Sequence, residues 1–599
     1  MPFQVSPGIN ISERDLTTVV PNVATSIGAI VGNFQWGPVL ERQSITTEND
    51  LVKTFGEPND TTFIDFLPAA NYLAYSNNLI VVRNISSSAR NAAVGDGAVI
   101  VQNKDSYDSA SFGTQLFVAK YPSVLGNTLK TIAIDSDGWA AAETGKSASQ
   151  TARNAGTATS LQLDQLSFLE SFNSSPGTSE DWKKANGNAT TGNDELHVLV
   201  IDEDGLFTGS PGEVLERHAF ISKASDAKRI DGSSNYIGNI LRNESAYVWL
   251  GVASQLTVNS VDVGTTVHAG SAKASGVFKR INSATPAEKI PGGSLVGGVD
   301  SGTLSAGEYQ AAYDLYAEPE VVDVTLIMAG GSSALSQADS RTVASHISSL
   351  CETRKDCVAF ISPHIDSVVR TSGEVDKIVA DKTAMSSSSY AVMDSSWKYQ
   401  YDRYNDVFRF VPMNADIAGL CARTDFTHDA WYSPAGYNRG TIKNIVKLSW
   451  EPTKADRDVM YQAGINPLTT QTGAGIILFG DKTAQTLPSA FDRINVRRLF
   501  IVLEKAIAIA AKAMLFEFND EFTRSQFVNI VSPFLREIQG RRGITDFKVV
   551  CDSSNNTGQV IDTNNFVGDI YIKPARSINF IQLNFIAART DVSFSEIGG

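Results

Sequence analysis

The side chains that most often carry out chemistry are scattered along this sequence of 599 residues. Six histidines could bind a metal or move a proton, but they do not fall at the spacing of metal ligands. The four cysteines are far apart, and no CxxC pair suggests zinc. We therefore predict no catalytic residue, no metal site and no cofactor. We interpret Cys351 and Cys357 as small buried hydrophobic residues. The full set of histidines and cysteines is His197, His218, His268, His346, His364, His428, Cys351, Cys357, Cys421 and Cys551.

Two aspartate-rich segments, Asp135-Ser-Asp137-Gly138 and Asp202-Glu-Asp204-Gly205, are the other candidates for a metal site. A calcium-binding EF-hand loop needs regularly spaced oxygen ligands, a glycine at its sixth position and a glutamate at its twelfth. The first segment has Lys146 at the twelfth position, and the second has Phe207 at the sixth. We predict that both are hairpin turns, in which Asp-Gly supplies the positive φ angles.

Several classes of protein are disfavoured by missing motifs and by charge. The sequence contains no GxGxxG or GxxxxGK[ST] nucleotide-binding loop and no GxSxG or HExxH motif. A formal charge of −15 argues against wrapping nucleic acid. There is no apolar run of about 18 residues and no signal-peptide pattern at the N-terminus. We predict a protein made in the cytoplasm, with no nucleic-acid partner and no membrane insertion.

Strands and helices alternate in two separated parts of the chain, as in βαβ units with a buried, mostly parallel sheet. We predict that residues 24–90 and 300–395 form one mixed α/β scaffold domain. The predicted strands are residues 26–32, 79–85, 321–328 and 357–362, and the predicted helices are residues 49–55, 64–76, 306–317 and 337–351.

The region between these two parts is rich in Ser, Gly, Asn, Thr and Asp and has short strands at residues 116–119, 131–134 and 196–202. This composition is typical of β-rich domains inserted into a scaffold. We predict an inserted outer domain at residues 91–190 and a second inserted or connecting domain at residues 191–299. The polar stretch that begins AAAETGKSASQTARNAGTATS, within residues 140–195, is predicted to be a loop or linker.

The last 200 residues predict a separate α+β domain at residues 396–599. A long helix at residues 496–518 precedes a second helix at 523–539 and three strands at 547–551, 566–572 and 578–586. Apolar residues at steps of three or four form one stripe along the long helix: Leu499, Leu503, Ile507, Ala510, Met514 and Phe518.

Two groups of arginines stand out in this domain. We predict that Arg493, Arg497 and Arg498, at the start of the long helix, form ion pairs. Arg536, Arg541 and Arg542 are either a solvated face or a docking surface for an acidic partner.

The first 23 residues are predicted to be an N-terminal arm. Ser6-Pro7-Gly8 breaks any helix, and Ile9 and Ile11 then alternate with polar residues as in a strand. Such a strand is either a frayed terminus or a strand offered to a neighbour.

A series of motifs resembles the tail sheath family of T4-like phages. The match is specific over residues 25–90 and 300–599 and loose over residues 90–300. The motifs are SPG (6–8), GNFQWGP (32–38), YP (121–122) with GN (126–127), WKYQYDR (397–403), DIAGLCART (416–424), SPAGYNR (433–439), GDKT (480–483), FDRINVRRLF (491–500), FTR (522–524), VVCDSSNN (549–556) and IKPARSINFIQLN (572–584).

This resemblance implies a structural subunit and not an enzyme. Its copies would form hexameric rings, stacked helically around an inner tail tube, with baseplate and tail terminator proteins as further partners. The sheath would contract and drive the tube through the host envelope. It also implies a place in the virion after assembly in the host bacterial cytoplasm.

The resemblance also implies roles for particular residues. Strands donated between subunits would come from Ile9 and Ile11 and from Val592 and Phe594 in a C-terminal arm at residues 587–599, with residues 578–586 in the receiving sheet. The C-terminal domain would lie nearest the tube, with Arg524, Arg536, Arg541 and Arg542 as the tube-facing residues.

Three alternatives remain open from the sequence. The first is the sheath of a phage-tail-like bacteriocin or secretion machine. The second is an α/β hydrolase or nucleotide-binding enzyme with β-rich accessory domains, and the third is a host-binding adhesin, suggested by the Ser/Thr/Asn-rich middle of the chain.

Overall fold

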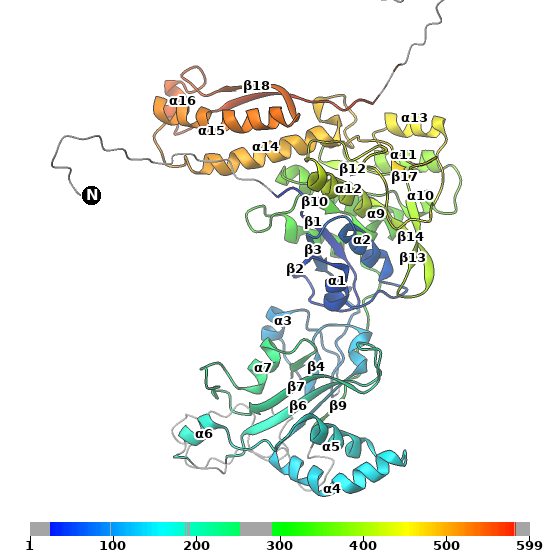
Figure 1. Ribbon diagram of the computed structural model, residues 1–599, viewed down its shortest axis with the longest axis vertical. Helices are drawn as coiled ribbons and strands as arrows, with labels where there is room; N and C mark the ends of the chain where they lie inside the picture. Colours follow the sequence, from blue (N-terminus) through cyan, green and yellow to red (C-terminus); the bar gives the residue numbers. More distant parts are fainter. Residues whose placement is uncertain are drawn as a thin grey trace, which may run out of the picture.

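The protein has three parts, which the computed structural model describes over residues 24–95, 97–185, 187–188, 192–251, 290–579 and 582. A central body is built from residues 24–90 and 300–493. The described residues between 91 and 299 form a separate inserted lobe, joined to the body by a narrow neck, and a C-terminal lobe of residues 494–579 lies at the opposite end of the body (Figure 1).

A six-stranded sheet organises the body. Strand β1 lies in the middle and pairs in parallel with β3 and with β10, so that Gly28 faces both Leu79 and Leu326. Two distant parts of the sequence therefore share one sheet. The order is β12 (Ala391–Met393), β11 (Val358–Ile361), β10 (Leu326–Met328), β1 (Gly28–Gly32), β3 (Leu79–Arg83) and β2 (Arg42–Ile45), with β2 antiparallel to β3.

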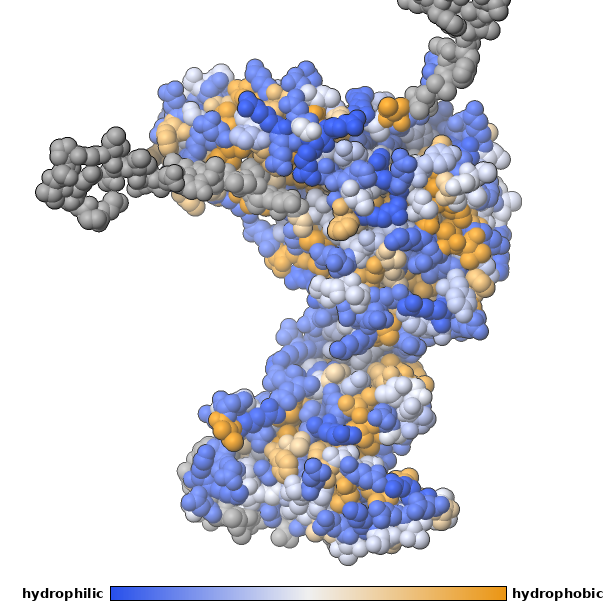
Figure 2. All heavy atoms as spheres, in the orientation of Figure 1, coloured by the Kyte–Doolittle hydropathy of each residue, from blue (hydrophilic) through white to orange (hydrophobic). Residues whose placement is uncertain are grey.

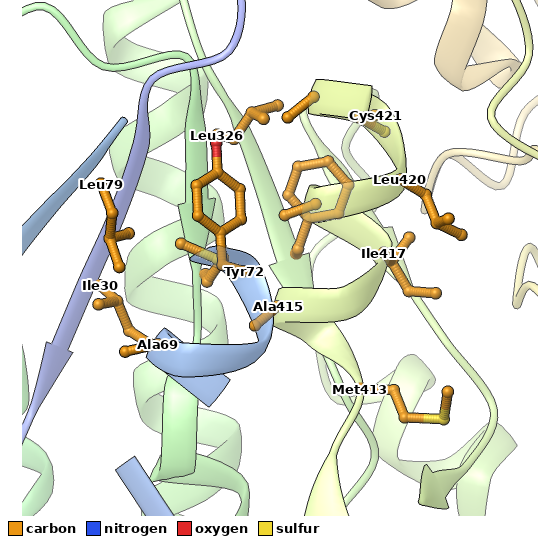
Figure 3. Close-up of a cluster of buried hydrophobic side chains, with 14 of the residues drawn as sticks. Ile30, Ala69, Tyr72, Leu79, Leu326, Met413, Ala415, Ile417, Leu420 and Cys421 are labelled. Carbon is orange, nitrogen blue, oxygen red and sulfur yellow. The ribbon is translucent and has the colours of Figure 1, made fainter. Parts of the chain in front are cut away.

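Helices cover both faces of this sheet, because alternate strand residues point to opposite sides. Ile30 belongs to the core on one face, and Ala29 and Val31 belong to the core on the other. Figure 3 shows the first face, where Tyr72 of α2 lies beside strand residues and α12 carries Ile417. The helices there are α1 (Glu48–Phe55), α2 (Phe63–Leu73) and α12 (Asn414–Thr427); α8 (Ala306–Tyr313), α9 (Gln337–Arg354), α10 (Ile365–Val368) and α11 (Glu374–Thr383) contribute to the second core.

Smaller sheets complete the body. The domain boundary at residues 395/396 stays a prediction, and α12, which comes after it in sequence, packs on the same sheet as α2. The remaining elements are the β13 (Trp397–Asp402), β14 (Val407–Pro412) and β15 (Lys447–Leu448) sheet, the β16 (Leu468–Gln471) and β17 (Gly475–Leu478) hairpin, and α13 (Lys454–Gln462).

The inserted lobe mixes helices with two antiparallel sheets. The larger sheet has the order β7-β6-β5-β9, and β4 pairs with β8. The strands are β4 (Phe117–Ala119), β5 (Leu129–Ile134), β6 (Glu195–Asp202), β7 (Glu213–Ser222), β8 (Val248–Leu250) and β9 (Gly292–Ser294); the helices are α3 (Lys104–Ser109), α4 (Ser136–Asn154), α5 (Ser160–Ser171), α6 (Glu180–Ala185) and α7 (Ile237–Asn243).

The loop predicted within residues 140–195 is wrong, because α4 and α5 occupy much of it. Asp135 is not in a hairpin turn: its carboxylate accepts hydrogen bonds from the backbone N–H groups of Asp137 and Gly138 and so begins α4. Trp139 of α4 and Phe168 of α5 pack into one core with the sheet. A few well-placed apolar residues were thus enough to dock two mostly polar helices. The second aspartate-rich segment does connect the β6–β7 hairpin, with Gly205 at φ +77°.

The neck is fixed by two side chains of the body. Arg83 is fully buried and donates hydrogen bonds to the carbonyl oxygens of Phe34 (2.8 Å), Gly37 (2.7 Å) and, from the inserted lobe, Pro122 (2.7 Å). Trp36 makes edge contacts with the rings of Tyr121 and Phe207 of the inserted lobe. Burial lowers the pKa of Arg83 to about 9. The neck is therefore a packed junction.

The C-terminal lobe contains two long helices and a two-stranded sheet, in agreement with the predicted α+β class. Helix α14 ends at Lys512, so the helix predicted over residues 496–518 is too long. Of the third predicted strand, residues 578–586, most lies outside the described residues, and Ile578 and Asn579 are in no strand. The elements are α14 (Ile494–Lys512), α15 (Glu521–Gly540), β18 (Ile544–Val550), α16 (Gly558–Asp562) and β19 (Asp569–Pro574).

Candidate assembly interface

The β18–β19 sheet covers the C-terminal lobe on one side only. Its inner residues, among them Phe547 and Ile572, pack on the core to which Val531 and Leu535 of α15 belong. The outer face is polar, with Tyr571 60% exposed and Lys573 opposite Asp546, their charged groups 2.9 Å apart. Packing against α15 therefore holds this short sheet in place.

Both edges of this sheet are open in the part of the chain that the structure describes. Within the described residues, β18 pairs only with β19, from Ile544 opposite Pro574 to Val550 opposite Asp569. An edge strand presents backbone N–H and C=O groups that can pair with a strand from another chain. The lobe thus has the geometry of an acceptor for added strands. The residues predicted to supply such strands, Ile9, Ile11, Val592 and Phe594, lie outside the described residues.

Helix α14 is fastened to the body by the first group of arginines. Arg498 forms a buried ion pair with Asp425 and donates to the carbonyl oxygen of Thr25 at 3.2 Å. Burial raises the pKa of Asp425, and the neighbouring Arg498 opposes that rise. Arg493 pairs with Asp481 at 3.2 Å. The ion pairs predicted for Arg493 and Arg498 are therefore confirmed and are internal to the chain.

Arg497 behaves differently from its two neighbours. Its guanidinium forms no ion pair with any described residue and instead lies over the ring of Phe491 at 4.1 Å and that of Tyr390 at 4.4 Å. For this residue the predicted ion pair is replaced by cation–π contacts.

The four arginines predicted to face a tube do not gather on one face. Arg524 donates to the side chain of Asn519 at 2.8 Å, near the beginning of α15. Arg541, at the other end of that helix, pairs with Asp429 of the body. Arg542 lines a groove between lobe and body. Arg536 is exposed, has no ion-pair partner in the described ranges and, unlike Arg542, does not line the groove.

The carboxyl edge of the body's sheet, where α/β enzymes bind ligands, is filled by the chain itself. Asp65 accepts hydrogen bonds from the hydroxyl of Tyr309 (3.0 Å) and from the backbone N–H groups of Asn33 (2.9 Å) and Gly331 (3.0 Å). Burial raises the pKa of Asp65 to about 6. These hydrogen bonds connect α2, α8 and two loops, so the carboxylate stabilises the packing of the body.

Two surfaces were missed by sequence reasoning. Phe518 was assigned to a buried stripe, but it lies beyond the end of α14 and is 82% exposed. The groove that contains Arg542 is lined by segments from residues 431 to 579, so its residues come together only in the fold. The acidic and aromatic sequence LFEFNDEF at residues 515–522 could have indicated that the segment around Phe518 is an exposed surface.

The overall fold resembles that of a known sheath protein. The crystal structure of the sheath tail protein of Listeria innocua superposes with a TM-score of 0.50 at 12% identity, covering 92% of this chain and 96% of that protein. At that identity the likeness concerns the fold alone. It confirms a multidomain α/β and α+β architecture of the kind that the sequence predicted.

Sequence comparison identifies the family. Residues 302–484 match the phage tail sheath protein central domain, and residues 486–588 match the phage tail sheath C-terminal domain. The tail sheath protein of Enterobacteria phage T4 is 35% identical, covering 99% of both chains, and that of a Vibrio phage, KVP40, is 34% identical, covering 99% of this chain and all of that protein. The chain belongs to the phage tail sheath protein family, and its function is that of a structural subunit of a contractile sheath in the phage tail.

The described residues contain neither a metal site nor a membrane span. No group of three or more His, Cys, Asp or Glu side chains in these ranges is placed to hold a metal ion. In the same ranges, every helix is too short or too polar to span a bilayer.

Proposed function

We propose that this chain polymerises into stacked hexameric rings around a rigid tail tube and that contraction of the polymer drives the tube through the host envelope. Family membership and the open-edged acceptor sheet support this proposal. Three tail sheath relatives carry the name of a structural protein, so we assign no enzymatic activity. The work of contraction would come from the free-energy difference between two packings of the same subunit.

Strand donation would keep the polymer connected while its subunits move. We assign the donated strands to the arms at residues 1–23 and 587–599, and the acceptor to β18–β19 of a neighbour. Four to six hydrogen bonds at about 0.5–1.5 kcal/mol each would contribute about 2–9 kcal/mol per strand. A main-chain link of this kind survives a large rigid-body movement, because the arm absorbs the displacement.

A modest contact with the tube completes the proposal. Such a contact must hold before contraction and release during it, and exposed ion pairs of about 0–1 kcal/mol each suit this need. Arg536 is the first candidate, because Arg524 and Arg541 already have partners and Arg542 lines the groove. Changing Arg536 to Glu should weaken assembly on tubes and leave tube-free polymers intact; equal decoration of tubes would place the contact elsewhere.

Further partners and the place of assembly follow from the same proposal. We propose that the two ends of the sheath contact baseplate and tail terminator proteins. We also propose that the sheath assembles in the host bacterial cytoplasm. A phage-tail-like bacteriocin or secretion machine could use the same subunit, although the relatives at 32–35% identity are phage proteins.

Electron microscopy of concentrated purified protein tests the proposed function. We expect striated tubes of sheath width, in negative stain and without any partner. Discrete particles at all concentrations would contradict the proposal and would favour the adhesin or enzyme alternative.

A further inference from the structure

One end of the C-terminal lobe exposes an unusual number of aromatic side chains. The aromatic turn, residues 513–522, connects α14 to α15. Phe516 is fully exposed, Phe522 is 76% exposed, and Leu515 and Phe518 are also exposed. Hydrophobic atoms are visible at the end of the lobe that carries α14–α16 (Figure 2). A cluster of this kind marks a contact surface.

The backbone of the aromatic turn is strained at one exposed residue, Phe516. Phe516 has φ +72°, in the left-handed region that a bulky residue rarely adopts. The turn is also acidic: Glu517 and Glu521 are exposed, and neither forms an ion pair with a described residue. Strain at an exposed aromatic residue is a feature found at binding surfaces.

A groove of opposite character lies where the lobe meets the body. This basic groove has a volume of about 910 Å³. Its apolar lining includes Trp431, Phe479 and Ile578. Two acidic residues line it, and one of them, Asp481, already binds Arg493 (3.2 Å) and Ser577 (2.7 Å).

Five cations line the basic groove. None of them forms an ion pair with another residue in the part of the chain that the structure describes. The groove therefore offers positive charge beside an apolar floor, which is the complement of an acidic, aromatic peptide. The cations are Arg439, Lys454, Arg457, Arg542 and Arg576.

The two surfaces of one molecule cannot meet. The aromatic turn ends within the first two residues of α15, whereas Arg542 and Ile544 of the groove follow the last residue of that helix. A helix of 20 residues is about 30 Å long. Figure 1 accordingly shows α16 and α13 at opposite ends of the upper part of the molecule.

We infer that the aromatic turn of one subunit docks in the basic groove of a second copy of this chain. The inference deepens the proposed function and rests on it. A contact between two different surfaces is head-to-tail, and repetition of such a contact produces closed rings or helical filaments. It therefore supplies the kind of subunit contact that a sheath needs, separately from the donated strands.

Carbodiimide cross-linking of the full-length protein tests the contact directly. The reagent joins a carboxylate to an amine without a spacer. We expect mass spectrometry to find Glu517 or Glu521 joined to Lys454 in covalent oligomers. Lys454→Arg, which keeps the charge and removes the reactive amine, should abolish that product. Its absence from parent oligomers would overturn the inference, as would cross-links of Lys454 to Asp591 or Glu596, which would show the C-terminal residues in the groove.

Charge reversal tests whether the contact drives assembly. A turn variant, Glu517→Lys with Glu521→Lys, and a groove variant, Arg457→Glu with Arg542→Glu, should each lower the yield of sedimentable polymer at least tenfold. An equimolar mixture should restore it, because each variant then meets a complementary neighbour. Glu143→Lys with Glu213→Lys, an equal charge change on the inserted lobe, should leave assembly intact and should not rescue the groove variant. Full assembly of either single variant, or failure of the mixture, would overturn the inference.

The two experiments separate this contact from the proposed function. Tubes without the cross-link would leave the sheath function standing and exclude the contact. The cross-link without tubes would support the contact and contradict the sheath function.

Discussion

The body and the C-terminal lobe handle their polar groups in opposite ways. In the body, Lys398 and Asp416 are both fully buried and paired at 2.9 Å, and Tyr75 adds a hydrogen bond to Asp416 at 3.2 Å. In the lobe, neither edge of the sheet pairs with another strand among the described residues, and the aromatic turn is exposed. A buried network of this kind resists rearrangement, whereas open edges and exposed aromatics invite partners. The comparison indicates a body that moves as a unit and a lobe that forms contacts.

Removal of the N-terminal arm should have the largest effect on polymer assembly, which the C-terminal lobe is proposed to mediate. We expect a chain without residues 1–15 to fold normally and to form no polymer, because one edge of each acceptor sheet would stay unpaired. Circular dichroism reports folding, and sedimentation reports assembly. Normal tubes from the shortened chain would show that the arm is dispensable.

A change to the buried ion pair tests the body. Lys398→Met should destabilise the protein by about 3–5 kcal/mol, because it leaves Asp416 buried without its partner. Chemical denaturation measures the loss. Lys398→Met combined with Asp416→Leu should recover most of it, since well-packed apolar residues often replace a buried pair. A single variant as stable as the parent would mean that this network does not hold the body together.

The pH dependence of the body should follow Asp394, which is buried at the end of β12. Ser362 donates to its carboxyl at 2.6 Å, and burial, with a smaller effect of Asp416, raises its pKa to about 8. An unfolded aspartate ionises near pH 3.9. The stability that protonated Asp394 contributes is thus complete below about pH 4 and is lost as the pH rises to about 8.

In the parent protein this carboxyl should lower the free energy of unfolding by on the order of 1 kcal/mol per pH unit between pH 6 and 8. Asp394→Asn should therefore show a smaller decline in stability over this range. Melting temperatures across that range measure it. Asp105→Asn, at an exposed position on α3, serves as the control. Parallel curves for parent and Asp394→Asn would rule out this carboxyl as the source.

The smallest effect on assembly is expected from removal of the inserted lobe. Arg90 and Val299 form a β-bridge, so the two ends of residues 91–299 already lie side by side. A variant that joins Arg90 directly to Asp300 should still polymerise. It also carries Trp36→Ser, because Trp36 would otherwise lose its aromatic partners and become exposed. Sedimentation and circular dichroism would check both properties. Loss of the fold would contradict the proposal that residues 91–299 are an insertion.

Sequence patterns located the regular elements of the body well. Apolar runs at β1, β3 and β11 and the periodic helices α2 and α9 were predicted within a few residues, because each carries its own hydrophobic period. The free, buried Cys351 and Cys357 also agree with their interpretation as small apolar residues. The motifs of residues 397–584 were specific enough to indicate the family by themselves.

Tertiary structure alone decided the rest, because it depends on contacts between distant residues. Composition could not show that α4 and α5 would dock through Trp139 and Phe168, nor that α14 would end at Lys512 and leave the next aromatics exposed. Arg536 and Arg541 looked equivalent in the sequence, but only the fold brings Asp429 to Arg541. The basic groove joins residues more than a hundred positions apart. Local patterns specify elements, whereas burial and pairing across the folded chain decide which surfaces remain available to a neighbour.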